Sequence, residues 1–161
     1  GYRDFDFSGN IQTSGSGLFS AFGASIKGSI TINYETNDAE NSTMSFYNCS
    51  LSNRTGAALT AANASVEITR CLIAGTGTAV TVTGSTLSFE DENELQTIDL
   101  AATDIALSMD AASTAACYGS ITVPRGFTLT NGTFTSEGVP QTPQKIEGTD
   151  ADPYDTYQFV Y

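Results

Sequence analysis

Two acidic segments carry the side chains that are best suited to bind a metal ion. The candidate ligands are the carboxylates of Asp91, Glu92 and Glu94 in one segment and of Asp150, Asp152 and Asp155 in the other. Calcium prefers oxygen ligands of this kind, but neither segment has the glycine-anchored spacing of an EF-hand loop. Acidic surface segments are more often simply solvated. We therefore expect no cofactor, and calcium at these carboxylates is the weaker alternative.

Three cysteines offer thiol chemistry. Cys49 lies three residues after Phe46 and Cys71 lies three residues after Ile68, so both occupy the same place in a pattern that repeats after 22 residues. If the chain stacks with this period, their Cα atoms lie about 4.8 Å apart, within the range of a disulfide. The pair is predicted to be either a disulfide or two stacked, buried free thiols. Cys117 has no partner at a matching position and is predicted to be a free thiol.

Five sequons are candidate acceptors of N-linked glycans. They begin at Asn41, Asn48, Asn53, Asn63 and Asn131. An Asn-X-Ser/Thr triplet is the acceptor signal in secreted proteins. The alternative is that some of these triplets arise by chance, since Ser and Thr are abundant in this chain. The sequons, the scarcity of lysine and the absence of histidine together favour an extracellular or cell-surface location.

No catalytic constellation is recognisable in the sequence. Glu67 and Asp99 alternate with apolar residues on predicted strands but fall in different strand columns, whereas glycosidases place two acids about 5–9.5 Å apart across a cleft. No glycine-rich loop joins a strand to a helix, as nucleotide binding would need. Three scattered cysteines without histidine cannot supply a zinc site. We expect no catalytic residues and a non-enzymatic protein.

Pairs of alternating apolar residues recur about every 21 residues along the chain. One column contains Met44/Phe46, Val66/Ile68, Leu87/Phe89, Leu107/Met109 and Phe127/Leu129; a second contains Ala57/Leu59, Val80/Val82, Ile98/Leu100 and Ile121/Val123. Short strands repeating at such a period, with glycine-bearing turns between them, are typical of a β-solenoid. Each strand of a solenoid pairs with its equivalent one coil away, which gives parallel sheets.

The clearest copy of the repeat is SVEITRCLIAGTGTAVTVTGS at 65–85, with weaker copies at 43–64, 86–105 and 106–126. This pattern resembles the right-handed parallel β-helix, or pectin-lyase-like, superfamily over residues 17–136. The segment GLFSAFGASIKGSITI also resembles the degenerate Gly-Leu-Phe repeats of secreted bacterial β-helix proteins. The resemblance implies a single-domain, all-β, right-handed solenoid of about five or six short coils.

The competing fold is an antiparallel β-sandwich, which also shows short strands at regular spacing. We favour the solenoid because the columns keep their register over several repeats. Enzymatic activity does not follow from the resemblance. Polygalacturonase-like members use a His-bearing motif, and this chain has no histidine. Pectate-lyase-like members use a basic residue with carboxylates that hold calcium. Here only Arg70 lies within a well-formed coil, and we expect it to solvate a turn.

The sequence divides into an N-terminal strand or cap at 1–16, a solenoid at 17–138, and a linker with an aromatic strand at 139–161. Tyr157, Phe159 and Tyr161 lie on one face of the last strand. Because the end of a solenoid needs a cap, we favour a cap strand. The alternative is an assembly strand that adds to the sheet of a neighbouring subunit and builds a filament.

Eighteen acidic and six basic residues give a formal net charge of −12. This charge disfavours binding to nucleic acid or to anionic membranes. No apolar run approaches the roughly 20 residues that span a bilayer, so membrane insertion is not expected. We predict a structural or adhesive module that self-assembles into surface filaments. The partners expected are a second copy of the chain or surface glycans. The alternative function is a carbohydrate-binding or carbohydrate-cleaving domain.

Overall fold

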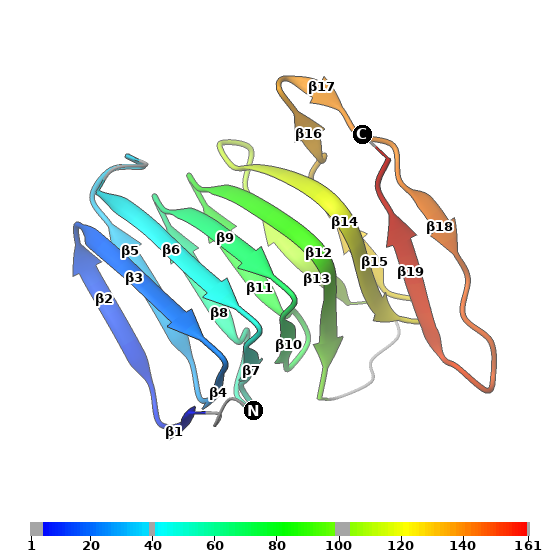
Figure 1. Cartoon of the computed structure of the whole chain (residues 1–161), viewed down its shortest axis with the longest axis horizontal. Coiled ribbons are helices and arrows are strands. Elements are labelled where there is room, and N and C mark those ends of the chain that lie inside the picture. Colours follow the sequence, from blue (N-terminus) through cyan, green and yellow to red (C-terminus); the bar gives the residue numbers. More distant parts are fainter. Residues whose placement is uncertain (1–4, 39–40, 99–103, 161) are drawn as a thin grey trace.

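The computed structural model describes residues 5–38, 41–98 and 104–160, which form strands and turns (Figure 1). The strands are β1 Phe5–Ser8, β2 Ile11–Gly15, β3 Gly17–Phe22, β4 Ala24–Lys27, β5 Ile30–Tyr34, β6 Ser42–Tyr47, β7 Ser50–Ser52, β8 Leu59–Ala62, β9 Ser65–Thr69, β10 Leu72–Gly75, β11 Val80–Thr83, β12 Thr86–Thr97, β13 Ile105–Met109, β14 Thr114–Pro124, β15 Thr128–Thr130, β16 Thr135–Ser136, β17 Val139–Pro140, β18 Gln144–Ile146 and β19 Tyr154–Gln158. No helix long and apolar enough to cross a membrane occurs in these ranges.

The chain winds into a parallel β-solenoid of about five turns. Face one is the sheet β2-β5-β8-β11-β13-β15. Face two stacks β3, β6, β9 and the first halves of β12 and β14, and face three stacks β1, β4, β7, β10 and the second halves of β12 and β14. All the pairings between these coils are parallel, so the antiparallel sandwich is not favoured.

Inward side chains of successive coils stack on one another and form the core. On face two, Phe46, Ile68, Phe89 and Cys117 are in register, and each is at most 1% exposed. Burying a side chain of the size of Phe or Ile contributes about 1.5–3 kcal/mol. Since each coil covers only its neighbours, the stability of the solenoid is approximately a sum of such nearest-neighbour contacts.

A column of left-handed residues turns the chain from face two to face three. Gly23, Asn48, Arg70 and Asp91 occupy equivalent places in successive coils, with φ between 53° and 62°. A left-handed conformation is rare for residues other than glycine and asparagine. At the next place, Gly119, an added Cβ would lie 2.0 Å from the Asp91 carbonyl oxygen, so only glycine fits.

The later coils do not follow the predicted columns. Leu107 and Val80 are in register on face one, although the period of 21 residues placed them in different columns. Ile121 and Val123 lie on face three, and the side chain of Ile98 is 43% exposed. The physical reason is extra chain between β12 and β13, which lengthens this coil and shifts the register after it. Leu100 lies outside the described residues.

The C-terminal end of the solenoid is closed. β19 pairs antiparallel with β14, and β18 pairs antiparallel with β19. The Phe159 ring packs 4.8 Å, centroid to centroid, from the ring of Phe134 inside this cap. The antiparallel strands end the parallel ladder of face three, and the buried rings of Phe134 and Phe159 cover the core of the last coil, while β15 is the outer strand of face one.

The N-terminal end is different, because β1 and β2 belong to the first coil and do not cover it. β1 pairs with β4, β2 pairs with β5 and β3 pairs with β6. In the described part of the chain no strand pairs with the outer edges of these three strands. The solenoid therefore has one capped end and one open end, and the open end is the one at the left of Figure 1.

Candidate functional site

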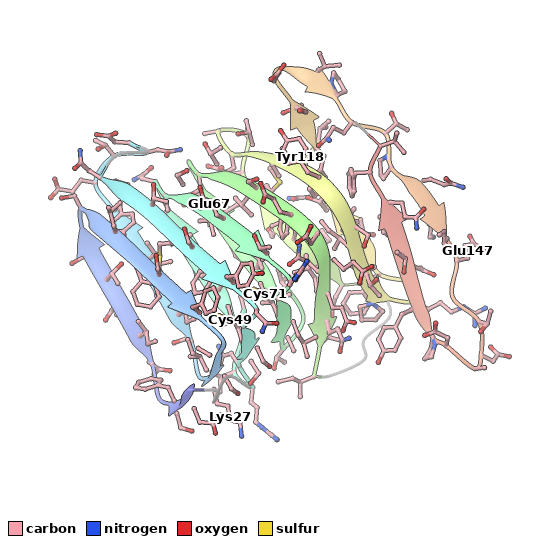
Figure 2. All side chains as sticks on the ribbon, viewed as in Figure 1. Lys27, Cys49, Glu67, Cys71, Tyr118 and Glu147 are labelled. Atoms are coloured by element: carbon pink, nitrogen blue, oxygen red, sulfur yellow. The ribbon has the colours of Figure 1, made fainter. Side chains whose placement is uncertain are left out.

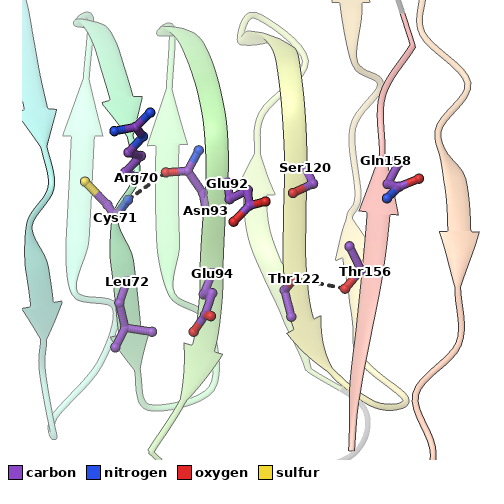
Figure 3. Close-up of a pocket in the computed structure, with 10 residues that line it drawn as sticks. All are labelled: Arg70, Cys71, Leu72, Glu92, Asn93, Glu94, Ser120, Thr122, Thr156 and Gln158. Atoms are coloured by element: carbon purple, nitrogen blue, oxygen red, sulfur yellow. Dashed lines mark hydrogen bonds between the residues drawn. The ribbon is translucent and has the colours of Figure 1, made fainter. Parts of the chain in front are cut away.

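An open groove crosses the outside of face three near the capped end (Figure 3). Its volume is about 530 Å³. Its lining residues come from β10, β12, β14, β19 and the corner before β10: Arg70, Cys71, Leu72, Glu92, Asn93, Glu94, Ser120, Thr122, Thr156 and Gln158. This set joins segments far apart in the sequence, because the C-terminal strand folds back onto β14.

Outward side chains of β12 make the groove acidic. Glu92 and Glu94 point outward on either side of the buried Asn93. Glu94 Oε2 accepts a hydrogen bond of 2.8 Å from Gln96 Nε2. Across the groove, Thr122 Oγ1 on β14 and Thr156 Oγ1 on β19 are hydrogen-bonded at 3.0 Å. The groove therefore presents acceptors and hydroxyls suited to a polar, hydroxylated ligand.

Arg70 lies at the corner beside this groove. Its Nε is 3.0 Å from Asp91 Oδ2, and both side chains are about half exposed. An exposed ion pair of this kind contributes at most about 1 kcal/mol. Arg70 does lie in a turn, as predicted, and it pairs there with one of the carboxylates proposed as calcium ligands.

The second acidic segment is part of the cap. Asp150 Oδ1 lies 2.8 Å from Arg125 Nη1, and Asp152 lies in the turn that precedes β19. Asp155 is 2% exposed, and its two carboxylate oxygens accept hydrogen bonds from the backbone N–H groups of Gly148, at 2.7 Å, and Gly126, at 3.4 Å. Both carboxylate oxygens of Asp155 therefore already accept hydrogen bonds from the protein itself.

The ionisation of Asp155 follows from these contacts. Burial raises the pKa of its carboxyl, but the N–H groups of Gly148 and Gly126 and the ammonium of Lys145 outweigh burial and hold the pKa below its ordinary value. Among the described residues, no group of three or more Asp, Glu or Cys side chains gathers as metal ligands would. Calcium at either acidic segment stays a prediction.

Cys49 and Cys71 lie side by side on neighbouring coils, just before the paired strands β7 and β10 (Figure 2). Both are buried free thiols, as is Cys117. The neighbouring thiol of Cys71 lowers the pKa of Cys49, against the effect of burial. The same contact and burial raise the pKa of Cys71, and burial raises the pKa of Cys117 to about 12. The structure therefore has the two cysteines as stacked free thiols, and a disulfide between Cys49 and Cys71 stays a prediction.

The five sequons differ in accessibility. Asn48 and Asn131 are exposed, and Asn41 is exposed with its Nδ2 donating to Asp38. Asn63 Nδ2 donates to the Tyr34 carbonyl. Asn53 is 8% exposed and its Nδ2 donates to the Ala57 carbonyl, so a glycan there would break a buried turn. Asn48 and Asn131 are therefore the most accessible acceptors, and glycosylation stays a prediction.

The predicted assembly strand lies on its own chain in this structure. Tyr157 pairs with Ile121 of β14, and Phe159 is buried against Phe134. This arrangement is that of a cap strand. Tyr161 lies outside the described residues. Exchange of the strand between subunits stays a prediction.

The open end is a site that the sequence did not single out. The partly buried side chains of Phe7, Ile11, Phe19 and Ala21 pack on the core from one side only. With their neighbours they line a cavity of about 340 Å³. The signal in the sequence was the strand GLFSAF, which is apolar on both faces and carries no charge.

Comparison of the chain with protein-family models, with curated proteins and with solved structures found no match. Its function is therefore inferred from geometry alone.

Proposed function

We propose that the protein is a non-enzymatic structural or adhesive module of the cell surface or extracellular space, which self-associates through an end of its solenoid. Membership of the pectin-lyase-like superfamily is part of this proposal and is supported by the parallel coils. The observation that carries the proposal is the difference between the two ends. A solenoid exposes apolar side chains and unpaired backbone at each end unless a cap covers them.

The chemistry of the described polar side chains supports a structural role. Arg70 pairs with Asp91, Arg125 pairs with Asp150, and Asp155 fixes the cap. Each of these contacts joins two segments of the fold.

Light scattering combined with electron microscopy of the full chain tests self-association. We expect dimers or larger assemblies at tens of micromolar, and a monomer of 16.9 kDa throughout that range would contradict the proposal. A variant lacking residues 154–161 separates the two ends. Loss of filaments in that variant would support exchange of the C-terminal strand, whereas unchanged assembly would remove it.

The outer groove favours a second candidate function, the binding of a carbohydrate. Its carboxylates and hydroxyls could hydrogen-bond the hydroxyl groups of a sugar chain lying across β12, β14 and β19. A glycan array followed by calorimetry tests this function. We expect Glu92→Gln with Glu94→Gln to abolish any binding detected, and Glu35→Gln, an exposed position elsewhere, to leave it unchanged. Binding that survives the double substitution would exclude the groove.

A further inference from the structure

We propose that the open end binds the open end of a second copy, so that two solenoids join head to head through antiparallel pairing of β3 with β3. This inference rests on the self-association proposed above and specifies the surface, the partner and the symmetry. A two-fold axis brings the same surface of each copy together, and the resulting dimer is closed.

The first observation is that β3, within the described part of the chain, lacks the protection that edge strands usually carry. Natural edges are blunted by charged residues, proline, bulges or a covering segment. β3 has the sequence GLFSAF, without charge or proline, and its outward residues Leu18 and Phe22 are 71% and 59% exposed. The Phe22 ring stacks on the ring of Tyr47 at 4.7 Å, centroid to centroid, so it is held in place. An apolar edge of this kind is expected to pair with another strand.

The interior of the first coil is also incomplete. Phe7, Ile11 and Phe19 point inward but remain partly exposed, because no further coil of the described residues packs on them. In the same coil, Thr13 Oγ1 is buried and lacks a hydrogen-bond partner among the described residues, although buried hydroxyls normally have one. A second apolar end placed on this one would continue the core across the interface.

Charge favours a second copy as the occupant. The chain carries −12 overall, and this charge opposes contact between its long faces. Residues 5–34, which form the first coil and the two strands after it, β4 and β5, contain Asp6 and Lys27 as their charged residues, and these cancel. The open end is thus a neutral surface on an acidic molecule, where two copies approach with the least repulsion.

The register of the pairing follows from the sequence of β3. Directly opposed residues of an antiparallel pair lie on the same face of the sheet, so the inside of one copy must meet the inside of the other. Pairing Ser20 with Ser20 of the other copy meets this condition. It places Phe19 opposite Ala21 in the interior, a large side chain against a small one. On the outside it places Leu18 opposite Phe22 and covers both.

The size of the open end is sufficient for a stable dimer. The edge strands β1, β2 and β3 contain 4, 5 and 6 residues. At about 3.3 Å per residue and a layer about 10 Å thick, with the interior included, each copy buries roughly 600–700 Å². The total of about 1,300 Å² lies within the range of specific interfaces, about 1,200–2,000 Å².

A charge swap at Ser20 tests the proposal, because this residue would lie on the two-fold axis. Ser20 is exposed, so neither Ser20→Lys nor Ser20→Glu disturbs the core. In either variant alone, like charges meet across the axis, and we expect the dimer dissociation constant to rise at least about 100-fold. Mixing the two variants places opposite charges together and should restore a 1:1 heterodimer. Analytical ultracentrifugation measures all three samples.

Ser88→Lys is the matched control, since Ser88 lies in the same outward column of face two as Ser20, three coils away from the edge strand β3. We expect this control to dimerise as the unaltered chain does. If the unaltered chain associates and Ser20→Lys associates equally well, the head-to-head pairing is wrong while self-association stands. If the unaltered chain is monomeric, both proposals fail. Association of the Ser20 variants only when mixed, with the control unaffected, confirms the surface and the symmetry.

Discussion

Asp155 stabilises the cap through contacts that a sequence does not reveal. Its carboxylate accepts hydrogen bonds from the backbone N–H groups of Gly148, before β19, and Gly126, after β14. Its Oδ2 also lies 3.7 Å from Lys145 Nζ. A buried carboxylate with such donors is costly to replace, because the donors are left without a partner. The residue joins the cap to the last complete coil.

Asp155→Asn is expected to lower the free energy of unfolding at pH 7 by about 2 kcal/mol, the size of a charge-assisted contact in a buried site. Since the folded pKa of Asp155 lies below that of the unfolded chain, the contribution is complete above about pH 4 and disappears as the pH falls through the lowered pKa. Urea unfolding at pH 7 and pH 3 measures it. Asp152→Asn, an exposed control, should change stability by less than about 0.5 kcal/mol at either pH. An equal loss in both variants would refute this role.

The stacked thiols give a second prediction at single residues. Because the thiol of Cys71 lowers the pKa of Cys49, alkylation of Cys49 should reach half its maximal rate at a lower pH than that of an ordinary thiol. Cys71→Ala removes the thiol that lowers the pKa of Cys49, so the midpoint should move to higher pH. Mass spectrometry of iodoacetamide-treated protein follows each cysteine separately. Cys117, whose pKa is raised, is the internal control. A midpoint that does not move in Cys71→Ala would show that the thiol contact is absent.

At the scale of elements, the alternation of apolar residues was enough to predict parallel coils. Val66 and Ile68 alternate in a segment flanked by turns, and the structure places them in a buried, parallel strand. The register of the last coils was not predictable, because Ile98 and Leu100 continue the alternation of apolar residues, whereas the next strand of face one begins only at Ile105. The turn at Arg70 was predictable, but its left-handed conformation was not, because this conformation belongs to a column of stacked corners with Asn48 and Asp91 and contradicts the preference of arginine.

The cap was predictable in type but not in detail. Alternating aromatics at the C-terminus indicated a strand, and β19 is one. Its antiparallel direction depends on the chain reversal between β14 and β19, and its anchor is Phe134, a residue from a different segment. Long-range packing of this kind has no periodic signature.

Phe159→Ala should therefore loosen the cap. A buried phenylalanine replaced by alanine costs about 3–5 kcal/mol, and Phe159 is 5% exposed. We expect a clear fall in thermal stability, with faster proteolysis after β15. Val160→Ala, at a neighbouring side chain that is 82% exposed, should leave stability unchanged. If both variants melt alike, β19 is not a cap.

At the scale of the whole molecule, stability should vary along the solenoid axis. Central coils are covered on both sides, whereas the first coil is covered on one. Native-state hydrogen exchange of the monomeric Ser20→Lys variant should show amides of β2 and β3 exchanging before those of β8 and β11. In the unaltered, associated chain, the difference in exchange rate between these two groups of amides should become smaller. Uniform protection along the axis would contradict a nearest-neighbour solenoid.

The parallel ladders also give the protein a mechanical direction. Backbone hydrogen bonds on all three faces run from coil to coil, along the solenoid axis, while the covalent chain runs across it (Figure 1). Tension along the axis therefore separates one rung at a time, whereas tension along the strands loads many hydrogen bonds in shear. A molecule that is pulled by the two ends of its solenoid should therefore lose its coils one after another at low force. A molecule that is pulled along its strands should withstand a higher force.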